Sequence, residues 1–317
     1  MKKHTISLVG ETGGELRIAG DILAEAILAL IEGAQRATRL YVEGESVRKG
    51  PRPGWLDAAC RIEVTGLKSG SVEVCVEAPT LQEAVPDRFD ASTQLILFGE
   101  AGRPLDVSQT SVDFFAEVLD RTVSDSTEDL LADRNLLDTC IRFAKVSGPR
   151  FEGIRLDGVT RARRPVVIRN QDVSKIERLR DETPEPRAVR LSGLLDTISA
   201  TRPDIVLRLP NKTSVPARLE AVDPDLLSKL FGQQVVISGM AQFRPSGRLL
   251  VVDVEDIAPA GTADQLWQRA PRMQPLRSSP VATLVPQDGG TGVGAFFGTW
   301  PGDESDQELQ RILRELE

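Results

Sequence analysis

The stretch Asp223-Pro-Asp-Leu-Leu-Ser-Lys-Leu-Phe231 has the pattern of a short helix, although the residues on both sides of it have the pattern of strands. Asp223 is placed to cap the helix, and Pro224 occupies the first helical position, where its missing N–H is not needed. The position of this helix determines how the surrounding strands are grouped.

Five strands flank this helix, three before it and two after it. Turns at Pro210-Asn-Lys212 and Pro245-Ser-Gly247 separate neighbouring strands. The strands are expected at residues 189–198, 205–209, 214–219, 234–243 and 248–257. This order of elements resembles an OB-fold, a five-stranded Greek-key barrel, and predicts an OB-like barrel over residues 187–258.

OB-folds that grip single-stranded nucleic acid combine a basic groove with aromatic stacking platforms. Residues 187–258 contain nine Lys and Arg against eight Asp and Glu, and Phe231 and Phe243 are their aromatic residues. The barrel is therefore interpreted as a scaffold or protein-binding module in preference to a strand-binding one.

Residues 1–182 mix strands with helices and predict an α+β domain. The first helix is expected over residues 18–31, where Asp21 is the candidate cap and apolar residues surround the axis. The other expected elements are a hairpin over residues 58–78 that includes Cys60 and Cys75, helices near 107–121 and 126–145, and a second hairpin formed by 151–156 and 165–169.

A cluster of arginines lies in and around the second hairpin. Its members are Arg155, Arg161, Arg163, Arg164 and Arg169. Such a cluster can hold the phosphates of a nucleic acid. The alternative is a solvated turn whose arginines pair with acidic residues, and this alternative is favoured.

The chain carries 39 Lys and Arg against 47 Asp and Glu, a formal net charge of −8. This balance argues against a protein whose whole surface coats nucleic acid or an anionic membrane. No apolar run approaches the roughly 18 residues of a membrane span, and no export signal is recognised, so a cytoplasmic protein is expected. Cys60, Cys75 and Cys140 show no metal-binding spacing, which fits free thiols better than a disulfide between Cys60 and Cys75.

Histidine is nearly absent, because His4 is the single one and lies near the start of the chain, in a segment expected to fray. Histidine-based acid–base catalysis, catalytic triads and zinc sites with several histidines are therefore not expected. No catalytic residue, metal site or cofactor is predicted, and the chain is interpreted as a non-enzyme.

Residues 259–297 are rich in Pro, Gly, Ser, Thr and Ala and predict a flexible linker. After it, residues 298–317 contain a capping box, Ser305-Asp-Gln-Glu308, which marks the start of a short helix. Leu309, Ile312, Leu313 and Leu316 then form one apolar stripe, opposite Arg311 and Arg314. A helix this short is marginal alone in water, so it is expected to fold on a partner.

The segment Phe297-Gly-Thr-Trp-Pro-Gly-Asp-Glu-Ser-Asp-Gln-Glu-Leu309 resembles the C-terminal tails of bacterial antitoxins that pair with PIN-domain ribonuclease toxins. The resemblance implies a type II antitoxin whose tail wraps the toxin and blocks its carboxylate-rich, magnesium-dependent centre. Such antitoxins are usually small proteins with a DNA-binding module, whereas this chain places an α+β domain and a barrel before the tail. The partner-binding residues expected from the tail are Trp300, Pro301, Asp303, Glu304, Leu309, Arg311, Ile312, Leu313, Arg314 and Leu316.

In this interpretation Trp300 is the anchor, because its indole offers the largest burial on the tail. Arg311 or Arg314 would approach the acidic metal site of the toxin. Two alternatives stay open. The tail docks on its own domain or on a second copy in a homo-oligomer, or the barrel and the arginine cluster bind operator DNA or RNA.

Overall fold

The computed structural model describes residues 1–10, 19–68, 73–89, 105–124, 128–148, 151–158, 165–198, 204–219 and 224–273. The chain divides into a compact unit, Met1–Arg277, and a second unit, Ser278–Glu317. The α+β domain and the barrel predicted from the sequence therefore both belong to the first unit. None of the described helices is long and apolar enough to cross a membrane.

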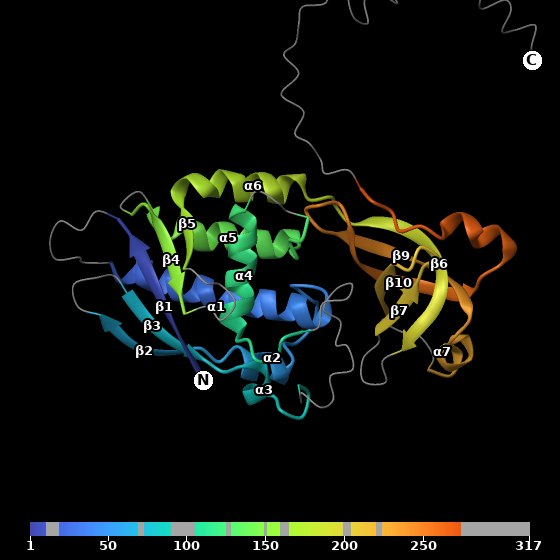
Figure 1. Cartoon of the computed structure of the whole chain (residues 1–317), viewed down its shortest axis with the longest axis horizontal. Helices are drawn as coiled ribbons and strands as arrows, with labels where there is room; N and C mark the ends of the chain where they lie inside the picture. The colour runs from blue at the N-terminus through green and yellow to red at the C-terminus, as the bar shows by residue number, and fades with distance from the viewer. Residues whose placement is uncertain are drawn as a thin grey trace, which may run out of the picture. The chain divides into compact units, whose positions relative to one another are not determined.

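A five-stranded sheet forms the first layer of the α+β domain (Figure 1). Its strands are β1 (Lys2–Val9), β2 (Glu63–Lys68), β3 (Glu73–Ala78), β4 (Gly153–Asp157) and β5 (Val166–Arg169), in the order β2-β3-β1-β4-β5. All neighbouring pairs are antiparallel. The N-terminal strand β1 is thus the central strand, which fixes the start of the chain in the core.

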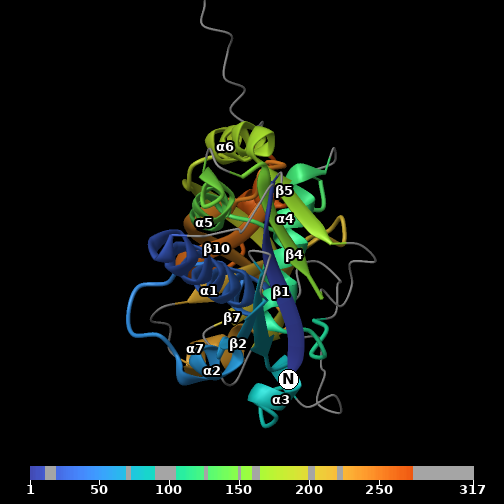
Figure 2. The ribbon, with the colours of Figure 1, turned by 90° about the vertical axis from the view of Figure 1, so that its left-hand side faces the viewer.

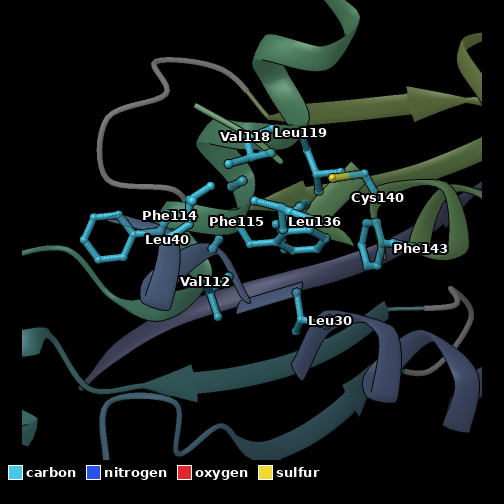
Figure 3. Close-up of a cluster of buried hydrophobic side chains, with 14 of the residues drawn as sticks. Leu30, Leu40, Val112, Phe114, Phe115, Val118, Leu119, Leu136, Cys140 and Phe143 are labelled. Atoms are coloured by element: carbon cyan, nitrogen blue, oxygen red, sulfur yellow. The ribbon is translucent and has the colours of Figure 1, made fainter. Parts of the chain in front are cut away.

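Helices form the second layer and lie on one face of this sheet (Figures 1 and 2). The helices of the domain are α1 (Gly20–Glu43), α2 (Gly54–Ala59), α3 (Leu81–Ala84), α4 (Ser111–Val123), α5 (Arg134–Lys145) and α6 (Val173–Glu182), with a short 3-10 helix η4 (Asn170–Asp172). Figure 3 shows the apolar cluster where they meet, with the rings of Phe115 and Phe143 edge to face at 5.4 Å. This core stabilises the layer that carries the site described below.

Side-chain caps set two helix starts that the apolar pattern misplaced. Helix α4 was expected from residue 107 but begins at Ser111, because Thr110 forms a capping box with Asp113. Helix α5 was expected from residue 126 but begins at Arg134, where the Asp133 carboxylate accepts the Leu136 N–H at 2.9 Å. In α1 the cap is Ala19, not Asp21, and the helix continues to Glu43.

The expected first hairpin is also shorter than predicted. Residues 54–59 form helix α2, and Cys60 is its C-terminal cap, so Cys60 does not face Cys75 across a hairpin. All three cysteines are free, with Cys60 and Cys140 buried and Cys75 half-buried. Burial raises the pKa of Cys60 to about 12 and keeps its thiol protonated at neutral pH. The preference for buried free thiols is thus confirmed for two of the three.

A closed five-stranded barrel follows the α+β domain. Its elements are β6 (Arg187–Ile198), β7 (Asp204–Arg208), β8 (Ser214–Leu219), α7 (Pro224–Leu230), β9 (Gln234–Phe243) and β10 (Leu249–Pro259). The strands close in the order β10-β8-β7-β6-β9, and β10 pairs with β8 in parallel. This barrel, with its helix between the third and fourth strands, fits the OB-fold expected from the sequence. Asp223, which was expected to cap this helix, lies outside the described residues.

The segment after the barrel is structured further than expected. Strand β10 ends at Pro259, and residues 260–273 include a 3-10 helix, η5 (Thr262–Trp267). Ala270 and Met273 pack against the barrel core, and the Met273 N–H donates to the Gly247 carbonyl at 2.9 Å. The prediction of a linker is therefore wrong for residues 259–273, which belong to the barrel because Ala270 and Met273 pack against its core. The remainder of the predicted linker lies outside the described residues.

Candidate functional site

The partner-binding residues expected in the tail all lie in residues 298–317, outside the described residues. The arginine cluster is described in part, because Arg161, Arg163 and Arg164 also lie outside them. Arg155 on β4 and Arg169 on β5 share one face of the hairpin, since Arg169 pairs with Gly153, two residues before Arg155. These two are the members of the cluster that the structure places.

Arg155 makes a bidentate ion pair with its neighbour on the same strand. Its Nε and Nη2 donate to the two carboxylate oxygens of Asp157 at 2.7 and 2.9 Å, and this pairing raises the pKa of Arg155. The backbone N–H of Arg169 donates to the Asp172 carboxylate at 2.8 Å, and the Arg169 side chain is exposed. For Arg155 the paired interpretation is therefore confirmed.

A pocket of about 550 Å³ lies inside the unit Met1–Arg277, lined by both the α+β domain and the barrel. The α+β domain contributes the last turns of α1, the first turns of α4 and residues just before α4 and α5. The barrel contributes the β7–β8 turn and the β9–β10 turn, and residues 270–272 complete the wall. No motif in the sequence marked this pocket, because its wall comes from segments far apart in the chain.

Gln109 is the most deeply buried polar side chain of the pocket wall, with 1% of its surface exposed. Its backbone is held on both sides. The Gln109 N–H donates to the Asp106 carbonyl at 3.1 Å, and the Gln109 carbonyl accepts the Leu81 N–H at 3.0 Å. The next residue, Thr110, caps α4. These contacts fix the backbone at Gln109.

Arg244 supplies the buried cation of the pocket, with 7% of its surface exposed. It begins the β9–β10 turn, where its N–H donates to the Arg248 carbonyl at 2.9 Å and its carbonyl accepts the Gly247 N–H at 2.8 Å. Burial, together with the smaller effect of the neighbouring Arg248, lowers the pKa of Arg244 to about 10, and Tyr41 opposes this shift. The guanidinium nevertheless stays protonated at neutral pH, so the pocket contains a positive charge in a poorly hydrated place.

Gly247 lets this turn come close to the segment after the barrel. It has φ of +74°, and a Cβ there would collide with the Met273 carbonyl. The turn that carries Arg244 is thereby held from two sides, by β9 and β10 and by residues 270–273. Arg244 is therefore positioned by the backbone as firmly as Gln109.

Two exposed arginines stand at the rim of the pocket. Arg248 and Arg272 both pair with Glu128, at 2.9 and 2.7 Å. Glu128 belongs to the segment before α5. Arg248 lies in the β9–β10 turn, and Arg272 lies in the segment after the barrel. These ion pairs connect the α+β domain to the barrel at the pocket mouth.

Close to the pocket, a buried ion pair joins the same two parts of the chain. Arg218 on β8 pairs with Glu45, which follows α1, and both side chains are less than a tenth exposed. Arg218 also contacts Asp253 on β10 at 3.0 Å. Buried charges persist only when they are paired, so this contact fixes how the barrel meets the end of α1.

No family model matches the chain, and no curated protein is significantly similar to it. Inference about function therefore rests on the residues of the chain itself. Two features can be used, the sequence of the tail and the geometry of the pocket. They are independent, because the pocket is built from described residues before 273 and the tail begins at 298.

Proposed function

We propose that the chain is an antitoxin-like protein that binds and neutralises a PIN-domain ribonuclease through residues 298–317. The observation that carries this proposal is the string Trp300-Pro-Gly-Asp-Glu304, followed at once by a capping box and an apolar stripe. The string resembles the tails of antitoxins paired with such toxins, and the stripe has the spacing of a helix that docks in a groove.

The energetics of such a tail favour binding. Burying Trp300 and three or four aliphatic side chains contributes roughly 8–12 kcal/mol, at about 1.5–3 kcal/mol for each side chain. Ordering the segment opposes this by about 2–5 kcal/mol. The surplus of about 3–10 kcal/mol reaches micromolar affinity at its upper end, since a micromolar complex corresponds to roughly 8 kcal/mol. The acidic centre of a PIN-domain nuclease is also the target that Arg311 or Arg314 would pair with.

Nucleic-acid binding by the barrel is the second candidate, and the fit of the barrel to an OB-fold supports it. The described contacts weaken it. Arg190 on β6 pairs with Asp264 at 3.0 Å, and Arg208 on β7 pairs with Asp196 at 2.6 Å. Each of these exposed cations is already neutralised by an acid, so neither is a strong phosphate contact.

The experiment is co-expression with the product of the adjacent gene, followed by affinity capture and an assay of RNA cleavage. Two forms of the chain are compared, the full chain and a form that ends at Phe297. The full chain is expected to retain the nuclease and suppress its RNA cleavage, and the shortened form to lose both properties. Equal retention by both forms would contradict the proposal. Capture of nucleic acid that weakens steeply with salt would favour the second candidate.

A further inference from the structure

The pocket inside the unit Met1–Arg277 has the size and lining of a small-molecule site. Its volume of about 550 Å³ falls within the roughly 300–1,000 Å³ typical of such sites. Apolar side chains form much of its wall, namely Leu105, Phe114, Leu131, Val215 and Leu249. A few polar groups stand among them, and this combination gives both affinity and orientation.

The buried amide of Gln109 has an unmet hydrogen bond. Its Nε2 has no hydrogen-bond partner among the residues that the structure describes, although only 1% of the residue's surface is exposed. Buried polar groups in native proteins are nearly always paired, so an exception calls for an explanation such as a bound water, an ion or a ligand. Gln109 lines the pocket, so a ligand atom that accepts a hydrogen bond is the natural partner.

Glu117 supplies the opposite property in the same pocket. It lies two turns into α4 and is half-buried, and its Oε2 has no partner within the described ranges. A carboxylate oxygen accepts hydrogen bonds, whereas the Gln109 amide nitrogen donates them. The two groups together therefore suit a ligand that carries both an acceptor and an N–H donor. The edges of nucleobases carry such groups side by side.

An aromatic surface stands beside these polar groups. Tyr41 at the end of α1 lies 4.9 Å from Phe114, measured between ring centroids, with the rings tilted by 40°. Both residues line the pocket. Flat heterocycles stack on such surfaces, and this stacking contributes to nucleotide binding without depending on the base.

Arg244 is the main positive charge for an anionic group, because the two arginines at the rim already share an acidic partner. Arg244 lies in the wall, and Arg248 and Arg272 stand at the rim, paired with Glu128. Guanidinium binds phosphate with two parallel hydrogen bonds. Two further carboxylates line the pocket. Asp106 is engaged by the Ser108 N–H and hydroxyl at 3.1 and 2.6 Å, and Asp129 is exposed.

From this arrangement we infer that the pocket binds a free mononucleotide. The base lies against Tyr41 with its edge toward Gln109 and Glu117, and the phosphate lies toward Arg244. This site is separate from the tail, so the inference does not depend on the proposed function. The proposed nucleotide site lies where the barrel contacts the helices of the α+β domain.

The test is calorimetric titration of the full chain with the four ribonucleoside 5′-monophosphates, the matching nucleosides and inorganic phosphate. At least one nucleotide is expected to bind with a dissociation constant below about 1 mM. Its nucleoside and phosphate alone are each expected to bind at least about tenfold more weakly, because each keeps half of the contacts.

Two variants separate a ligand site from a structural one. Gln109→Leu removes a donor that has no partner, so thermal stability is expected to be equal or higher while nucleotide affinity falls at least about tenfold. Arg244→Met is expected to lower affinity for the nucleotide and leave the weak binding of the nucleoside unchanged. The control is Arg208→Met, an arginine of β7 that is paired with Asp196 and is not part of the pocket wall.

Four outcomes would overturn the inference. They are no nucleotide binding near 1 mM, phosphate binding as tightly as the nucleotide, wild-type affinity in Gln109→Leu, and single-stranded RNA binding more tightly than every mononucleotide. A fall in stability of Gln109→Leu together with unchanged affinity would assign Gln109 to packing. Failure of the inference leaves the tail proposal untouched, because loss of nuclease capture on shortening the chain is measured without nucleotide.

Discussion

The Arg218 guanidinium on β8 and the Glu45 carboxylate just after α1 form an ion pair that is shielded from water, with 6% and 7% of the side chains exposed. Gly44, with φ of +78°, ends α1 in the left-handed conformation and turns the chain so that Glu45 meets the barrel. The burial raises the pKa of Glu45 above 4.5, although Arg218 opposes the shift. The contact between barrel and helices therefore includes a charge pair in which removal of either side chain leaves the other charge buried with a weaker set of partners.

Arg218→Met is expected to destabilise the chain more than Glu45→Gln. The first change leaves the buried Glu45 carboxylate only its longer contact with Arg48, at 3.7 Å, and removing one partner of a buried pair typically costs about 3–5 kcal/mol. The second leaves Arg218 its contact with Asp253 at 3.0 Å. Urea unfolding measures both, with Arg190→Met as control, since Arg190 forms an exposed pair worth at most about 1 kcal/mol. Equal losses in all three variants would contradict a buried pair.

His4 is expected to make the stability depend on pH. The sequence suggested a frayed start, but His4 lies in the central strand β1 with 1% exposure, and its Nε2 is 3.1 Å from the Thr110 hydroxyl. Burial lowers the pKa of His4 below 6.5, with Lys2 acting in the same direction and Asp113 against it. Below pH 6.5 His4 is protonated in the unfolded chain but stays neutral in the folded chain, so the free energy of unfolding falls as the pH drops.

The measurement is urea unfolding at several pH values between about 7.5 and 5.5, where carboxylates have mostly finished titrating. His4→Gln keeps a hydrogen-bonding side chain and cannot titrate. The free energy of unfolding of His4→Gln is therefore expected to change much less between these pH values than that of the unchanged protein. Glu45 acts in the opposite direction at lower pH, because its raised pKa makes the folded chain bind its proton first. An unchanged pH profile in His4→Gln would show that another group is responsible.

Gly33 of α1 lies directly against the ring of Phe115 on α4. A Cβ there would fall onto the ring edge of Phe115, closer than van der Waals contact permits. Gly33→Ala is therefore expected to destabilise by about 1–3 kcal/mol, despite the better helix propensity of Ala. The control is Gly20→Ala in the same helix, where nothing lies within 4 Å and stability should be unchanged or slightly higher. Equal stability of the two variants would contradict this packing.

The barrel was predictable because its signals are local. Alternating apolar residues and short turns placed the strands at residues 214–219 and 234–243, and the structure has β8 and β9 at the same bounds. The helix starts were less predictable. Leu130 and Leu131 continue the apolar pattern of α5, but the Asp133 cap starts the helix after them. Apolar residues that are buried just before a helix can continue the spacing of the apolar residues inside it, so the spacing alone does not show where the helix begins.

The pocket was not predictable, because its key contacts join distant residues. Gln109 was expected inside a helix, whereas its carbonyl accepts the N–H of Leu81 and its side chain is buried beside the barrel. Arg244 adjoins Pro245-Ser-Gly247, a sequence typical of a solvent-exposed turn. It is buried because residues 270–273 return over that turn, and these residues were expected to be a flexible linker. No short-range pattern contains either contact.

Trp300→Ala is expected to weaken binding to the PIN-domain nuclease by about 2–4 kcal/mol, a loss of about 30-fold to 700-fold, if the indole is the anchor of the tail. The matched control is Trp267→Ala in η5, whose side chain is 44% exposed on the described part of the chain. Both changes remove one indole, so they alter composition and fluorescence alike, but only Trp300 lies in the antitoxin-like string. Calorimetric titration of the purified nuclease gives the two affinities. A larger loss from Trp267→Ala would move the nuclease-binding surface to the barrel, and equal small losses would leave the aliphatic stripe of Leu309, Ile312, Leu313 and Leu316 as the main contact.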